Sequence, residues 1–157
     1  MELSTYAGVD MHRDDADIVV LLVSSDPSLV ATVSSMLNRA EYVISVIGVA
    51  CEADAMAMMR QCQRTGGRRM PDLVLLSVEY PGQTKQRFFT AMQDEALLGQ
   101  IPVCALATSL ADQERRALYE AGANAIVERV DTLDGLSEAL NTIVSFWFRL
   151  AKRAYIA

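Results

Sequence analysis

Histidine and cysteine, which supply much of the chemistry of enzymes and metal sites, are scarce in this sequence. His12 is the only histidine among 157 residues, and it has no partner for catalysis or metal binding. The three cysteines, Cys51, Cys62 and Cys104, show no C-x-x-C spacing. An odd number without motif spacing predicts free thiols in a reducing compartment. We therefore expect a cytoplasmic protein with no bound metal and no cofactor.

Long hydrophobic runs are missing as well. The longest ones, such as the run from Ile18 to Val23, have the length of a strand and not of a membrane span. Residues 1–16 carry charges where a signal peptide would have its apolar region. We therefore expect no membrane partner.

Positive charge is in deficit, with a formal net charge of −6. Nucleic-acid binders usually present a basic face, so we expect no nucleic-acid partner. Hydrophobic residues make up 52% of the chain, which is enough to build a core, and 157 residues fit one compact domain. We predict a domain over residues 17–153, a flexible tail over 1–16 and a short tail over 154–157.

Apolar, β-branched runs alternate with segments of helical periodicity. Strands are predicted at 18–23, 42–49, 73–76, 102–106 and 125–127, and helices at 27–39, 53–64, 86–97, 111–121 and from about 132 to 153. Asp26 is a good N-cap for the first helix, and Gly122 a good end for the fourth. This alternation predicts a parallel sheet with helices on both faces, as in a flavodoxin-like (βα)5 sandwich or a truncated Rossmann unit.

Glycine-rich phosphate-binding motifs are absent. The first predicted strand is followed by Ser24-Ser25-Asp26-Pro27 instead of G-x-G-x-x-G, and no G-x-x-x-x-G-K-[ST] occurs. These absences exclude a dinucleotide site and a P-loop, and they favour the flavodoxin-like three-layer sandwich.

In such a sheet, ligands bind beyond the carboxyl ends of the strands, near the point where strand order reverses. The polar and small residues at these predicted ends are Ser24, Ser25, Asp26, Ser77, Glu79, Ala107, Thr108, Ser109, Glu128 and Arg129.

Several stretches resemble the receiver domain of response regulators, the CheY-like family. Residues 71–82 read P-D-L-V-L-L-S-V-E-Y-P-G, similar to the family's P-D-L-V-L-L-D-x-x-x-P-G. The I-P-V at 101–103, the A-G-A-N at 121–124 and the D-A-M at 54–56 also match family segments in the right order. The resemblance covers about residues 18–147 and implies an α/β fold with strand order 2-1-3-4-5.

The resemblance also implies that the phosphorylation chemistry is lost. The family's two Mg²⁺-binding acidic residues match Ser24 and Ser25, and its phosphate-accepting aspartate matches Ser77. Its switch threonine or serine matches Ala107, with Thr108 adjacent, and its lysine matches Arg129. A serine hydroxyl is a weak nucleophile without an adjacent base, and hydroxyls are poor Mg²⁺ ligands.

We therefore expect a degenerate receiver, not an enzyme, that acts independently of phosphorylation through protein–protein contacts. One alternative is a receiver that still binds Mg²⁺ or phosphate through Asp26, Glu79 or a modified Ser77. Another is a small-molecule sensor that uses the vacant pocket.

The expected interface lies on the fourth helix, the fifth strand and the last helix, the face that receivers generally use for partners. The apolar stripe that we expect to cover the sheet consists of Leu133, Leu136, Leu140, Ile143, Trp147 and Leu150. The ending Phe146-Trp147-Phe148 resembles that of small regulators that partner bacterial phytochromes and are commonly dimers. We expect a homodimer, and a signalling partner such as a sensor kinase or output protein, with interface residues Arg115, Arg116, Tyr119, Val144, Phe146, Trp147 and Phe148.

Overall fold

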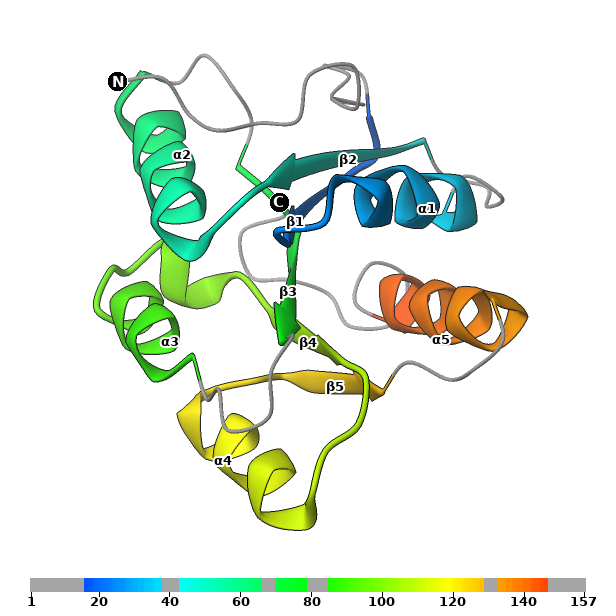
Figure 1. Ribbon diagram of the computed structural model, residues 1–157. Coiled ribbons are helices and arrows are strands. Elements are labelled where there is room, and N and C mark those ends of the chain that lie inside the picture. Colours follow the sequence, from blue (N-terminus) through cyan, green and yellow to red (C-terminus); the bar gives the residue numbers. More distant parts are fainter. Residues whose placement is uncertain (1–15, 38–42, 66–69, 79–84, 129–132, 147–157) are drawn as a thin grey trace.

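The computed structural model describes residues 16–37, 43–65, 70–78, 85–128 and 133–146. Strands and helices alternate along the chain (Figure 1). The strands are β1 (Ile18–Val23), β2 (Ile44–Val49), β3 (Leu73–Val78), β4 (Val103–Ala107) and β5 (Ala125–Glu128). The helices are α1 (Pro27–Leu37), α2 (Glu52–Thr65), α3 (Gln86–Gln93), α4 (Asp112–Ala121) and α5 (Leu133–Ser145), with a 3-10 turn, η1, at Leu98–Gln100.

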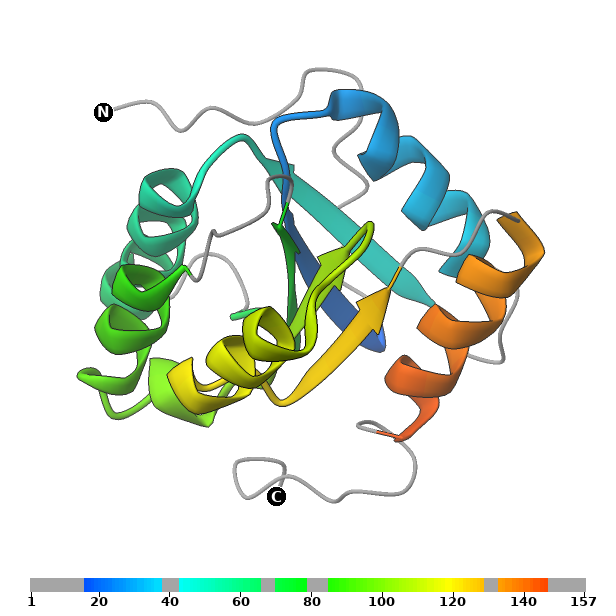
Figure 2. The same ribbon diagram turned by 60° about the horizontal axis from the view of Figure 1, so that its bottom comes forward.

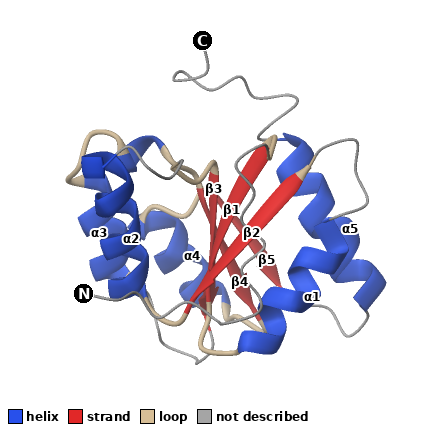
Figure 3. Cartoon of the chain, turned by 90° about the horizontal axis from the view of Figure 1, so that it is seen from above, coloured by secondary structure: helices blue, strands red, loops and turns tan. Residues whose placement is uncertain are grey.

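All strand pairs are parallel, and the order across the sheet is β2-β1-β3-β4-β5. Helices α1 and α5 cover one face, while α2, α3 and α4 cover the other (Figure 3). This arrangement confirms the predicted flavodoxin-like sandwich and its strand order. The expected tails lie outside the described residues, apart from Ala16.

The two faces of the sheet carry separate cores because successive strand residues point to opposite sides. In β1, Val19, Leu21 and Val23 pack toward α2, α3 and α4, whereas Ile18, Val20 and Leu22 pack toward α1 and α5. The whole of β1 is therefore buried, which is why its sequence is a continuous apolar run and not an alternating one.

Several element ends differ from the predictions. Helix α3 ends at Gln93 and not at Leu97, because the chain turns there and brings Leu98 into the core at 0% exposure. Strand β2 begins at Ile44, two residues later than predicted. Helix α4 ends as predicted, with Gly122 at φ 133°, a conformation that suits glycine. The predicted last helix beyond residue 146 lies outside the described residues.

The predicted apolar stripe of α5 is confirmed at Leu136 and Leu140 and differs at position 143. Leu136, Leu140 and Val144 are buried at 3%, 0% and 4% exposure and face α1 and the sheet, while Ile143 is only half-buried. Val144 was expected at an interface, and this expectation is wrong because Val144 belongs to the core. The correction follows from i, i+4 spacing, which carries the buried stripe along the helix. Within the described ranges no helix is long and apolar enough to cross a bilayer.

Candidate functional site

A pocket of about 260 Å³ opens at the carboxyl ends of β1, β3 and β4. Strand order reverses between β1 and β3, so this is the place where open α/β sheets bind ligands. The structure brings together four residues singled out from the sequence, Ser24, Asp26, Ser77 and Thr108, and adds three apolar ones. The lining residues are Ser24, Asp26, Leu29, Ser77, Val78, Leu106 and Thr108.

The other predicted positions lie near this pocket or outside the described residues. Ser25 is exposed beside Ser24, and Ala107 is the last residue of β4, buried at 1% exposure. Ser77 lies within β3 and not after it, since that strand extends to Val78. Glu79 and Arg129 fall among the residues that the structure does not describe.

The carboxylate of Asp26 serves the start of α1. Its Oδ1 atom accepts hydrogen bonds from the backbone N–H of Ser28 at 3.0 Å and from the Ser28 hydroxyl at 2.7 Å. The backbone N–H of Asp26 in turn donates to Ser24 Oγ at 3.1 Å. Asp26 is therefore the N-cap that the sequence predicted, and its negative charge stabilises the positive end of the helix dipole.

The described residues do not fit the Mg²⁺ site of a working receiver. By the resemblance above, that site uses two acidic residues beside the phosphate-accepting aspartate. The described lining offers instead three hydroxyls, which are poor Mg²⁺ ligands, and one carboxylate, that of Asp26, which caps α1. Across the described part of the chain, no group of three His, Cys, Asp or Glu side chains lies together as a metal site would require.

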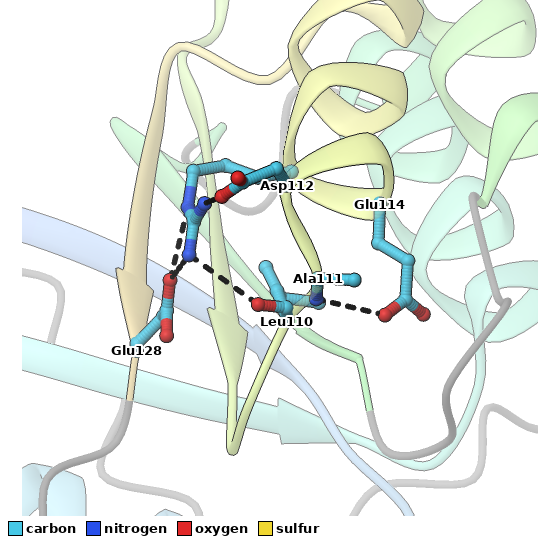
Figure 4. Close-up of polar contacts among 6 residues, drawn as sticks. Leu110, Ala111, Asp112, Glu114 and Glu128 are labelled. Atoms are coloured by element: carbon cyan, nitrogen blue, oxygen red, sulfur yellow. Dashed lines mark hydrogen bonds and ion pairs between the residues drawn. The ribbon is translucent and has the colours of Figure 1, made fainter.

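Arg115 on α4 connects Glu128, at the end of β5, to Leu110 in the β4–α4 loop and to Asp112. Figure 4 shows these three partners around the dashed contacts. The Nε atom of Arg115 donates to Glu128 Oε1 at 3.0 Å, and its Nη2 atom contacts the same oxygen. Its Nη1 atom donates to Asp112 Oδ1 at 2.9 Å, and Nη2 reaches the carbonyl of Leu110 at 3.4 Å. Hydrogen bonds to Glu128 and then to Asp112 raise the pKa of Arg115 above its ordinary value. Arg115, which we expected at an interface, therefore has partners within the domain.

Asp72 is a buried carboxylate that sequence reasoning gave no role. It is 3% exposed, and its Oδ2 atom accepts a hydrogen bond from the N–H of Val19 at 2.8 Å. Its own N–H donates to the Val19 carbonyl at 2.7 Å. Asp72 immediately precedes β3, at the amino ends of the strands, whereas the pocket lies at their carboxyl ends. Its hydrogen bonds link β1 to β3, so its role is structural.

Some of the predicted interface residues are exposed, and others lie outside the described residues. Tyr119 and Phe146 are large apolar side chains that are 48% and 46% exposed, and Arg116 is exposed. Trp147 and Phe148 lie outside the described residues. Sequence reasoning missed a second groove, of about 470 Å³, beside this surface. Its lining residues are Ile126, Val127, Glu128, Gly135, Glu138, Ala139, Thr142 and Ile143.

The parallel sheet with order 2-1-3-4-5 and the pocket at its reversal point define a doubly wound, flavodoxin-like protein. No protein-family model and no curated protein matches this sequence. Among solved structures, it is similar to the phosphorylated cyanobacterial phytochrome response regulator RcpA, with a TM-score of 0.75 and 23% identity over 87% of this chain and 98% of that one.

Two further response regulators are similar in structure. The Mn²⁺-bound form of Rcp1 gives a TM-score of 0.71 and 24% identity over 87% of this chain and 98% of that one. The response regulator RPA3017, from red light signalling of R. palustris, gives a TM-score of 0.76 and 18% identity over 87% of this chain and 97% of that one. The chain therefore has the fold of response-regulator receiver domains.

Proposed function

We propose that this chain is a receiver-like signalling module of a two-component-type system that works without phosphorylation. The observation that carries the proposal is that Ser77, which matches the family's phosphate-accepting aspartate by sequence resemblance, lines the pocket together with Ser24 and Thr108. Phosphoryl transfer requires a nucleophile and a cation that neutralises the incoming oxygens. The described lining supplies neither an ionised acceptor at position 77 nor a carboxylate pair for the cation.

The described lining of the pocket also contains no nucleophile paired with an available base. A serine nucleophile needs an adjacent base, and the carboxylate of the described lining, Asp26, is bonded to Ser28. This arrangement supports a non-enzymatic role.

The module acts through protein–protein contacts on the face formed by α4, β5 and α5. Tyr119 lies four residues after Arg115, which contacts β5, so both share one side of α4. Phe146 follows Ile143 by three residues, and Ile143 lines the groove beside β5. Exposed aromatic side chains gathered on one face favour an interface. We propose that this face, with Arg116, Trp147 and Phe148, forms a homodimer and contacts a cytoplasmic partner such as a sensor kinase or output protein.

A thermal melt with and without Mg²⁺ plus beryllofluoride tests the phosphorylation-independent role. Beryllofluoride mimics an aspartyl phosphate, and a ligand that binds only the folded state raises the melting temperature. We expect no shift for this chain, under conditions that shift a receiver with an intact acceptor aspartate. A clear shift overturns the proposal.

Light scattering tests the dimer separately. We expect a dimer mass that falls in Phe146→Asp and is unchanged in Leu97→Asp, a matched control because Leu97 is also exposed, at 54%. A monomer mass for the unmodified chain contradicts the dimer.

The pocket volume of about 260 Å³ favours one further candidate, a small-molecule sensor. A sensor of this kind should show a higher melting temperature with a metabolite in the absence of Mg²⁺ and beryllofluoride. The increase should be lost in Ser24→Leu, because Ser24 lines the pocket.

A further inference from the structure

The groove between β5 and α5, here called the β5–α5 groove, lies at an edge of the sheet. Strand β5 pairs only with β4 among the described strands, and it lies between α4 and α5 (Figure 2). The groove is about 470 Å³ in volume. It is open to solvent along the edge strand and is therefore accessible to another polypeptide.

The groove combines an apolar floor with an acidic rim. Val127, Ala139 and Ile143 belong to the core on the α5 side of the sheet and form the apolar floor of the groove, while exposed Glu138 and half-buried Glu128 supply its carboxylates. Its described lining contains two carboxylates and no Lys or Arg.

The charged side chains of the described lining are both acidic. Glu128 accepts from Arg115, and Arg115 also contacts Asp112. The described lining thus holds the carboxylates of Glu128 and Glu138, and the guanidinium of Arg115 is bonded to the first of them. Glu138 is exposed, so an incoming cation reaches it without breaking an ion pair that the structure shows.

We propose that the β5–α5 groove binds a cationic amphipathic segment of a partner protein. An apolar side chain of that segment packs on Ala139 and Ile143, and flanking lysine or arginine side chains lie beside Glu138 and Glu128. The inference rests on the proposed role of this face in protein contacts and adds the chemistry of the partner. Complementary charge selects against wrong partners, because like charges brought together are unfavourable.

The same charges disfavour a second copy as the occupant. A two-fold interface centred on the groove brings the same patch of both copies together and sets Glu138 close to its equivalent. The exposed aromatic side chains of Tyr119 and Phe146 are not part of the groove lining, and they serve the proposed homodimer.

The test uses the full chain and two synthetic peptides, one of alternating leucine and lysine pairs and one with glutamate in place of lysine. Amide NMR shifts locate the binding site, and fluorescence anisotropy measures affinity. We expect the lysine peptide to shift the signals of residues 126–128 and 135–143. Glu138→Lys should weaken its binding about tenfold, as a close charge pair is reversed. The matched variant Asp94→Lys, with the same charge change on an exposed residue after α3, should weaken it less than twofold.

Four outcomes overturn the inference. If Glu138→Lys and Asp94→Lys lose the same affinity for the lysine peptide, the peptide is attracted only by the net charge of the protein. Equal binding of the glutamate peptide means a purely apolar groove, and no shifts at residues 126–143 mean no site there. A dimer mass lost in Glu138→Lys means that a second copy fills the groove. The Mg²⁺ and beryllofluoride melt is unaffected by all four, so failure here is distinct from failure of the phosphorylation-independent role.

Discussion

The carboxylate of Asp26 accepts two hydrogen bonds from Ser28, one from its backbone N–H at 3.0 Å and one from its hydroxyl at 2.7 Å. Asp26 also lines the pocket where a receiver would hold its cation. The acidic residue of the described pocket lining thus caps the start of α1.

The capping role of Asp26 predicts a stability effect. Asp26→Ala should lower the free energy of unfolding by about 1 kcal/mol, because the first turn of α1 loses its side-chain acceptor. Asp26→Ser is the matched control, since serine is also a good N-cap, and it should retain most of the stability. Urea denaturation measures both. Equal losses in the two variants would mean that Asp26 stabilises the fold through its charge at another site.

Restoring carboxylates should restore cation binding. In Ser24→Asp/Ser77→Asp, two added carboxylates join Asp26 around one pocket and repel one another, so the variant should melt below the unmodified chain in EDTA. Mg²⁺ should stabilise it by about 2.7 kcal/mol at a hundred times its Kd. The neutral variant Ser24→Asn/Ser77→Asn is the control and should show no response to Mg²⁺. A Mg²⁺ response in that control would place the cation elsewhere.

Substitutions at Val144 and Phe146 should differ in their effect on stability, because Val144 is buried in the core and Phe146 is exposed. Val144→Ala should cost about 2 kcal/mol, because its buried methyl groups are removed and a cavity is left. Phe146→Ala should cost much less stability, since that ring is 46% exposed, but should lower the molar mass in light scattering if the dimer forms there. Chemical denaturation gives the first result. A large stability loss in Phe146→Ala alone would reverse the assignment.

The cysteines should differ in reactivity and in their effect at high pH. Burial raises the pKa of Cys104 from 9.0 to about 12, whereas Cys51 is exposed, so alkylation at pH 8 should modify Cys51 and spare Cys104 in the folded state. Between pH 9 and 12 the unfolded chain loses this thiol proton and the folded chain keeps it. Stability should therefore fall as pH rises through that window.

Cys104→Ala provides the control for the pH effect, because its stability should fall less steeply between pH 9 and 10.5. Mass spectrometry of labelled peptides gives the order of alkylation. Rapid labelling of Cys104 in the native protein would show that β4 opens far more readily than its burial implies.

The fold was predictable because its signals are local and strong. Continuous apolar runs mark strands buried on both faces, as in β1, and Asp26 and Gly122 mark helix ends by their own side-chain and backbone properties. The end of α3 was missed because Leu98 is drawn into the core by tertiary packing, which overrides helical periodicity.

The site was predictable in position but not in its contacts. Ser24, Asp26, Ser77 and Thr108 meet because parallel strands end at one edge of the sheet. The stripe of α5 was assigned through Ile143, whereas the structure uses Val144, since i+3 and i+4 spacings fit the same sequence. The contact between Arg115 and Glu128 depends on how α4 lies against β5, which no local pattern encodes.

The most direct measurement of the central claim is the intact mass of the protein after incubation with phosphoramidate and Mg²⁺, a small phosphoryl donor that needs no kinase. A receiver with its acceptor aspartate serves as the positive control. The phosphorylation-independent role predicts an unchanged mass for this chain. Addition of the mass of one phosphoryl group, lost in Ser77→Ala or Asp26→Asn, would contradict it and show that the pocket still performs phosphoryl transfer.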